Sequence, residues 1–131
     1  MINNLSNWTK LFCATVITLI SQIFGGLDIL FKTLIFCMAA DYITGILCAV
    51  YEKKLNSKTG FKGIIKKTVI LIITALAATA GRIADFNGLR DMVIGFYIAN
   101  ESISILENAA KMDVPVVNKM KNILEQLKNK N

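Results

Sequence analysis

Histidine is absent from this sequence, proline occurs once, and the three cysteines form no Cys-x-x-Cys pair. Without histidine the chain lacks the commonest general base and the usual partner of a nucleophilic serine or cysteine. The cysteine spacing matches no metal-binding pattern, and an odd number of cysteines argues against a disulfide framework. Gly60 and Gly63 lack the spacing of a phosphate-binding loop. We therefore expect no catalytic residue, no metal and no cofactor, and a protein that is not an enzyme.

Charge is also scarce. Charged residues make up 18% of the chain and hydrophobic residues 54%, with a mean hydropathy of +0.53, whereas soluble domains average about 25% charged residues. The net charge of +6 is compatible with nucleic-acid binding. However, the lysines cluster beside apolar runs, where they orient membrane helices and meet anionic lipid. The expected partners are therefore membrane lipids, with no nucleic acid.

What the chain has instead is four apolar segments, at residues 11–27, 33–51, 68–84 and 92–106. A helix crosses a bilayer with roughly 20 mostly apolar residues. The pattern predicts an all-α integral membrane protein, one domain over residues 1–131, with three to four transmembrane helices and a C-terminal amphipathic helix. We expect the first segment to be retained, because no signal-cleavage site follows it. Gly25-Gly26 ends it, and a short connection at residues 29–32 predicts an antiparallel hairpin with the second segment.

A basic loop, residues 52–67, carries six lysines against one glutamate: Lys53, Lys54, Lys58, Lys62, Lys66 and Lys67. The positive-inside rule places this loop in the cytoplasm, and with it the N-terminus and the basic tail, residues 107–131. Segment 92–106 either crosses, which makes four passes, or lies at the interface, which leaves three, because Glu101 weakens its insertion. Residues 82–91 are charge-balanced and suit an external loop. Pro115 is expected to start the amphipathic helix, whose apolar positions are Val116, Val117, Met120, Ile123, Leu124 and Leu127.

Two polar features interrupt the apolar segments. Asp41 lies near the middle of the second segment, where a carboxylate costs about 2.5–3.5 kcal/mol, so it should face other helices or water, or be protonated. Small residues accompany it at four-residue spacing, which favours close helix packing: Ala40, Thr44 and Cys48, and Gly45 with Ala49. In the fourth segment a helix brings Glu101, Ser104 and Asn108 to one face, with Glu107 on an overlapping face. That stripe indicates either a water-lining helix or an ordinary surface helix with its polar side in solvent.

Three stretches of the chain resemble the toxin-secretion/phage-lysis holin family. They are Asp41-Tyr42-Ile43-Thr44-Gly45 followed by Ala49; Ser57, Gly60 and Gly63 with Lys66-Lys67; and Glu101-Ser102-Ile103-Ser104-Ile105-Leu106-Glu107-Asn108 with Pro115. Relatives often carry a glycine where this chain has Met112-Asp113-Val114, so the turn geometry there stays open. The resemblance implies a phage or prophage protein of the bacterial (host) cytoplasmic membrane that forms homo-oligomers and permeabilises the membrane. The released cargo would be a cell-wall-degrading endolysin or a toxin, and host cell lysis would follow.

On this interpretation the candidate residues fall into two groups. Pore lining or assembly is expected of Asp41, Thr44, Gly45, Ala49, Glu101, Ser104, Glu107 and Asn108. Orientation and lipid contact are expected of Lys53, Lys54, Lys58, Lys62, Lys66 and Lys67. Two alternatives remain: a small ion channel or transporter subunit that makes no large lesions, and a scaffold subunit with no pore.

Overall fold

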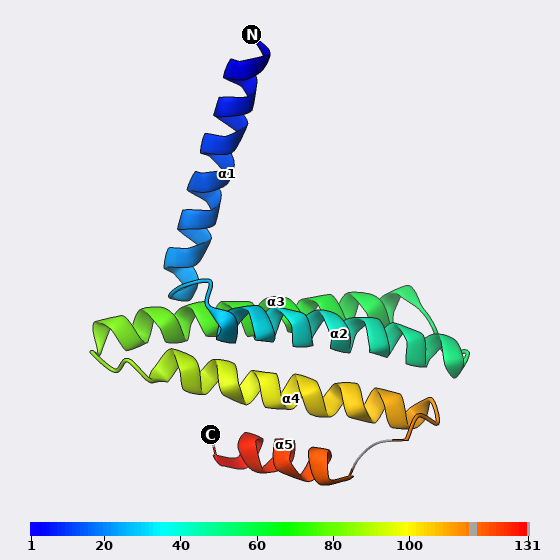
Figure 1. The fold of residues 1–131 in the computed structure, drawn as a ribbon. Coiled ribbons are helices and arrows are strands. Elements are labelled where there is room, and N and C mark those ends of the chain that lie inside the picture. Colours follow the sequence, from blue (N-terminus) through cyan, green and yellow to red (C-terminus); the bar gives the residue numbers. More distant parts are fainter. Residues whose placement is uncertain (116–117, 131) are drawn as a thin grey trace.

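This computed structural model describes residues 1–115 and 118–130, and in them helices joined by short turns are the only regular secondary structure. Figure 1 shows the five helices: α1 (Ile2–Phe24), α2 (Ile29–Tyr51), α3 (Ser57–Ile83), α4 (Leu89–Lys111) and α5 (Asn118–Lys130). The all-α prediction is confirmed. Within the described residues, α2 and α3 are each long and apolar enough to cross a bilayer.

Helices α2, α3 and α4 lie side by side and form a bundle, with α3 antiparallel to the other two (Figure 1). Their core is apolar and contains Phe31, Leu34, Met38, Ile70 and Ile94. Leu34, Thr74 and Ile94 are fully shielded, so each of the three helices contributes one side chain to the most enclosed part of the bundle. Most of the remaining large apolar side chains of α2 and α3 point outward, as expected for helices that face lipid.

The turn between α1 and α2 is short and specifically capped. Gly25 adopts a left-handed conformation (φ 74°) that ends α1, and Gly26 donates to the Ser21 carbonyl at 2.7 Å. The Asp28 carboxylate then accepts from the Phe31 amide at 3.0 Å and caps the N-terminus of α2. The predicted helix end at the glycine pair is therefore confirmed. The predicted connection at residues 29–32 is wrong, because the Asp28 cap makes those residues the first turn of α2.

The predicted antiparallel hairpin of α1 and α2 is also wrong. Helix α1 begins nine residues earlier than the predicted segment, at Ile2, and projects away from the bundle rather than running back along α2 (Figure 1). Its C-terminal end lies against α3, where the Arg82 guanidinium donates to the Gln22 carbonyl at 2.7 Å. The two positive-φ glycines, with Gly26 at φ 118°, turn the chain out of the bundle.

The basic loop is much shorter than predicted. Residues 57–67 form the first three turns of α3, and only residues 52–56 connect it to α2. The Asn56 side chain caps the new helix by accepting from the Thr59 amide at 2.8 Å. Lysine is a good helix former, and therefore a lysine-rich stretch directly before an apolar helix extends that helix.

The predicted external loop shortens in the same way, to residues 84–88, because α3 reaches Ile83 and α4 starts at Leu89. The predicted tail begins later than expected, since residues 107–111 belong to α4. Helix α5 folds back along α4 and turns Met120, Ile123 and Leu127 outward. The described part of α5 starts at Asn118; Val116 and Val117 lie outside the described residues, and the start at Pro115 stays a prediction.

Candidate functional site

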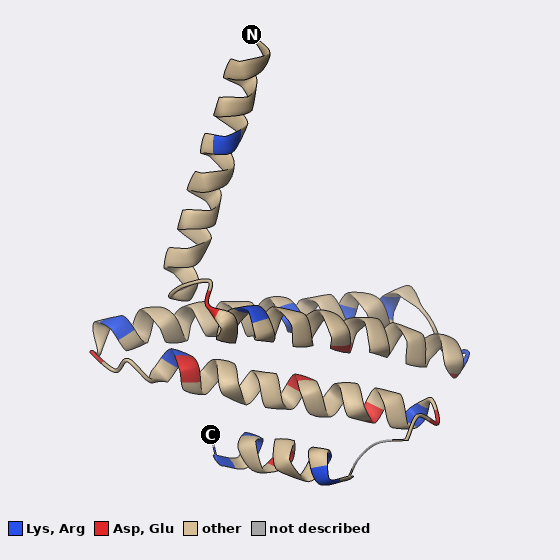
Figure 2. Ribbon diagram, in the orientation of Figure 1, with Lys and Arg blue, Asp and Glu red and all other residues tan. Residues whose placement is uncertain are grey.

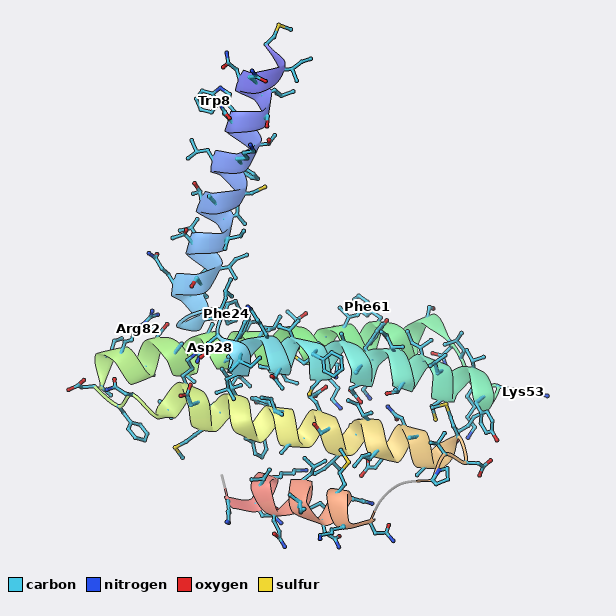
Figure 3. The ribbon with its side chains drawn as sticks, in the orientation of Figure 1. Trp8, Phe24, Asp28, Lys53, Phe61 and Arg82 are labelled. Atoms are coloured by element: carbon cyan, nitrogen blue, oxygen red, sulfur yellow. The ribbon has the colours of Figure 1, made fainter. Side chains whose placement is uncertain are left out.

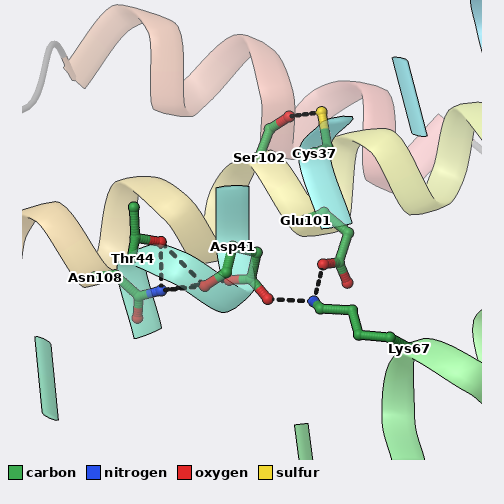
Figure 4. Close-up of polar contacts among 7 residues, drawn as sticks. All are labelled: Cys37, Asp41, Thr44, Lys67, Glu101, Ser102 and Asn108. Carbon is green, nitrogen blue, oxygen red and sulfur yellow. Dashed lines mark hydrogen bonds and ion pairs between the residues drawn. The ribbon is translucent and has the colours of Figure 1, made fainter. Parts of the chain in front are cut away.

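Lys67 lies on α3. Among the described lysines of residues 52–67, it alone reaches into the bundle. Its ammonium group forms ion pairs with two carboxylates, those of Asp41 on α2 and Glu101 on α4 (Figure 4). The exposed fractions of the side chains are 16% for Lys67, 16% for Asp41 and 5% for Glu101. We call these three residues the ion cluster.

The position of the ion cluster follows from helix geometry. Asp41 and Glu101 lie at the midpoints of two parallel helices, and Lys67 lies on the antiparallel helix at the same level. Removing a charge from water costs several kcal/mol unless a partner and further hydrogen bonds compensate. Two carboxylates around one ammonium group compensate Lys67 fully and leave the cluster negative when all three groups are ionised. The cluster therefore joins all three helices of the bundle at mid-height.

Asn108 extends the polar contacts one turn beyond Asp41. Its side-chain amide donates to the Thr44 hydroxyl at 3.0 Å and to the Asp41 carboxylate at 3.3 Å. On the other side of Asp41, the Cys37 thiol lies 3.7 Å from the Ser102 hydroxyl (Figure 4). Every buried side-chain nitrogen and oxygen of the described residues has a hydrogen-bond partner. The polar groups between α2 and α4 thus satisfy one another instead of being stranded among apolar residues.

Beside the ion cluster a pocket of about 560 Å³ lies between α3 and the pair α2 and α4. Polar groups from all three helices line it, among them Asp41, Tyr42, Lys66, Lys67, Asn100, Glu101, Ser104 and Asn108. Tyr42 reaches across to α3, where a Cβ added at Gly63 would meet its ring at 3.2 Å and one added at Gly60 would meet its hydroxyl at 3.3 Å. The two glycines therefore admit the tyrosine ring against the α3 backbone.

Seven of the eight residues expected in pore lining or assembly gather around this pocket or the ion cluster: Asp41, Thr44, Gly45, Ala49, Glu101, Ser104 and Asn108. Glu107 does not. It is exposed on the other side of α4, near Lys111 and Lys121 at the start of α5. The sequence placed Glu107 and Ser104 on one helix face. In the structure only Ser104 faces the bundle, because α2 and α3 cover only one side of α4.

Among the six lysines expected to set orientation, Lys67 has a different location from the others. Lys53, Lys54, Lys58 and Lys62 are exposed, and Lys66 is exposed at the rim of the pocket. Sequence reasoning missed the role of Lys67 because the segment was interpreted as a loop. On a helix, Gly60, Gly63 and Lys67 share one face, and that spacing was the available signal.

A second polar contact site lies at the other end of the bundle, around Arg90 in the first turn of α4. Its guanidinium group donates to both Asp28 carboxylate oxygens, at 2.9 Å each, and to the Phe24 and Gly26 carbonyls at 2.5 and 2.9 Å. This hydrogen bonding to Arg90 is the main reason that the pKa of Asp28 falls from 3.8 to about 2. Arg90 thereby fastens the end of α1 and the start of α2 to α4.

Comparison with known proteins gives one family. The sequence model of the bacteriophage holin family matches residues 18–129. An uncharacterised 14.9 kDa protein encoded in the nagH 3′ region of Clostridium perfringens is 41% identical over 130 residues, covering 97% of this chain and 98% of that protein. An uncharacterised protein of Listeria monocytogenes is 48% identical over 103 residues, 78% of this chain and 74% of its own length. No solved structure gives a significant match.

Proposed function

We propose, because this chain belongs to the bacteriophage holin family, that it oligomerises in the bacterial cytoplasmic membrane and permeabilises it. The permeabilised membrane would release an endolysin or a toxin, and lysis of the host cell would follow. The membrane location agrees with the family and with two helices, α2 and α3, that are long and apolar enough to span a bilayer. No enzymatic step is part of the proposal.

The proposed topology is multi-pass. Lys53, Lys54 and Lys58 around the α2–α3 turn favour the cytoplasmic side for that turn. Helix α4 runs alongside α2 and shares its core and its ion cluster, so we propose that it crosses with α2 and α3. If α1 also crosses, the N-terminus lies in the cytoplasm. If it does not, the N-terminus lies outside.

The ion cluster is the observation that carries the proposal. Charges at mid-height of membrane-crossing helices are expensive, and they usually mark a bundle interior or a water-filled path. Within one protomer Lys67 neutralises part of this charge and keeps the carboxylates of Asp41 and Glu101 covered. If protomers associate so that α3 moves from α2 and α4, the same polar groups line water between subunits.

Close packing between protomers requires small residues or polar contacts, since lipid provides no hydrophobic drive between helices. Ala49, Ala75, Thr79 and Ala80 supply small side chains that are at least partly exposed, and Ser104 with Asn108 supplies hydrogen-bonding groups. A closed bundle that can exchange internal polar contacts for contacts with neighbouring copies fits a protein that accumulates harmlessly before it opens the membrane.

The decisive experiment is controlled expression in a bacterium while membrane potential and release of a large cytoplasmic reporter are followed. Abrupt depolarisation with reporter release, advanced by an energy poison, is expected of a holin that makes large lesions. Unchanged potential at verified membrane expression would contradict the proposal and favour a scaffold subunit. Asp41→Leu should still insert but alter the time of depolarisation; unchanged timing would remove Asp41 from the mechanism.

A small ion channel is the second candidate, and one observation favours it. The ion cluster holds two carboxylates against one ammonium group, a balance that favours passage of cations through a narrow path. Such a channel or transporter subunit would depolarise the membrane but retain the large reporter. Release of the reporter therefore separates the two candidates.

A further inference from the structure

Only Phe24, at the C-terminal end of helix α1, packs against the bundle core, with its ring centroid 4.7 Å from that of Phe31. None of the residues of α1 is buried, and Trp8 and Phe12 are each 70% exposed. Figure 3 shows Trp8 far from the bundle, near the free end of the helix. A 23-residue helix with bare aromatic and aliphatic side chains requires a covering surface, because exposed apolar patches of this extent mark interaction sites.

Six apolar side chains of α1 form a stripe along one face at three- and four-residue spacing: Leu5, Trp8, Phe12, Val16, Leu19 and Ile23. Leu11 and Ile17, which are 59% and 54% exposed, lie outside this stripe. The opposite face carries Asn3, Asn7, Lys10, Thr18 and Gln22, and Lys10 is the only charged side chain of the helix (Figure 2). This pattern is typical of a helix that lies in the headgroup region rather than across the membrane.

The direction of α1 agrees with its pattern. If α2 and α3 cross the membrane, the bundle axis lies near the bilayer normal, and α1 leaves that axis crosswise (Figure 1). The crosswise orientation is held by hydrogen bonds from Arg82 and Arg90 to the Gln22, Phe24 and Gly26 carbonyls at 2.5–2.9 Å. Both cations also complement the negative end of the α1 dipole.

The lysines indicate on which side of the membrane α1 lies. Lys53, at the α2–α3 turn, and Arg82, at the α1 corner where α1 meets α3, mark opposite ends of the bundle (Figure 3). If the lysine-rich turn is cytoplasmic, the α1 corner is on the outer face.

We propose that α1 lies flat in the outer lipid–water interface, with its Leu5–Ile23 stripe toward the acyl chains and the N-terminus outside the cell. This inference rests on the proposed membrane function and replaces the expectation that the first segment crosses. The partner is a phospholipid surface. Lys10, the one charged side chain of the helix, meets its anionic headgroups, and Trp8 lies at the depth where tryptophan is enriched.

The test uses the single tryptophan of the chain. Trp8→Phe provides a background in which Phe12→Trp, Val16→Trp and Leu19→Trp are made one at a time. Fluorescence quenching is measured in phosphatidylcholine/phosphatidylglycerol vesicles whose lipids carry bromine at different acyl depths. A flat α1 places all three tryptophans at one shallow depth. A crossing helix spreads them over about 10 Å, at 1.5 Å per residue. Phe36→Trp, on the exposed face of α2, is the deep control.

Labelling with a membrane-impermeant maleimide gives a second readout, in a background without the native cysteines. Asn4→Cys should react in intact cells and Lys53→Cys only after the membrane is opened. Three results would overturn the inference while Phe36→Trp stays deep. The tryptophan depth could change steadily from position 12 to position 19, or Asn4→Cys could be labelled only after the membrane is opened. A second copy could also shield the tryptophans from every lipid quencher. A shallow Phe36→Trp would overturn the proposed membrane function as well.

Discussion

The ammonium group of Lys67 contacts the carboxylate of Glu101, 34 residues away along the chain and on a different helix. Glu101 is among the most enclosed polar residues described, with 4% of the whole residue exposed. It shares Lys67 with Asp41, so one cation holds together carboxylates of two helices. Stability of the bundle and the proposed opening of the membrane therefore depend on the same three side chains.

Removing the cation should separate α2 from α4. In Lys67→Met the two carboxylates face each other without a counterion, and breaking a buried pair in this way costs about 3–5 kcal/mol. Cys37, beside Ser102 between these helices, is buried, whereas Cys13 on α1 is exposed. We expect the rate of thiol labelling at Cys37 in mild detergent to rise roughly a hundredfold, with no change at Cys13. The neighbouring Lys66→Met is the matched control and should label like the parent protein; equal rates in the two variants would contradict the structural role of Lys67.

Either carboxylate, that of Asp41 or that of Glu101, should suffice to pair with Lys67. Asp41→Asn leaves Lys67 paired with Glu101, and Glu101→Gln leaves it paired with Asp41, so each single variant should stay close to the parent in Cys37 labelling. The double variant strands the ammonium group, and its cost should exceed the sum of the single costs by more than about 1 kcal/mol. Additive single and double costs would show that the three charges do not act as a unit.

Packing of Tyr42 against α3 should depend on the absence of a side chain at Gly63. A Cβ there would lie 3.2 Å from the ring, so Gly63→Val should push α3 outward and lower stability by about 1–3 kcal/mol. The thermal midpoint in detergent measures this loss. Gly45→Ala is the control, because its Cβ would meet only the Asn108 amide, at 3.7 Å. Replacing the tyrosine ring by the smaller leucine in Gly63→Val/Tyr42→Leu should recover most of the lost stability. No recovery would mean that the Gly63→Val substitution does not act through Tyr42.

Much of the fold could be predicted from hydropathy alone. The segments at residues 33–51, 68–84 and 92–106 fall within α2, α3 and α4 or end one residue beyond them, because apolar runs of that length form helices. The boundaries differ where polar residues favour a helix. Asn56 starts α3 ahead of its lysines, and Asp28 starts α2 ahead of the predicted segment.

The site and the path of α1 were harder to predict. Asp41, Glu101 and Asn108 could be identified because each is a polar residue in an apolar run, but Lys67 stands among five other lysines. Only the antiparallel placement of α3 distinguishes it, and that is a tertiary property. The orientation of α1 depends on Arg82 and Arg90 binding its last carbonyls, which no periodicity in α1 itself encodes.

Acid should release the Asp28–Arg90 contact. Hydrogen bonding to Arg90 lowers the pKa of Asp28 from 3.8 to about 2, so the unfolded chain takes up this proton at higher pH than the folded protein. The stabilisation from Asp28 is therefore fully present above about pH 4 and is lost as the pH falls through about 2. The thermal midpoint of the parent protein should exceed that of Asp28→Asn at pH 5, and the difference should shrink steadily toward pH 2. Other carboxylates titrate in both proteins and cancel from the difference. In an Arg90→Met background the main cause of the shift is gone, so the pH-dependent part of the difference between pH 5 and 2 should become much smaller. A difference that persists undiminished without Arg90 would mean that the Phe31 amide, and not the guanidinium group, lowers the pKa of Asp28.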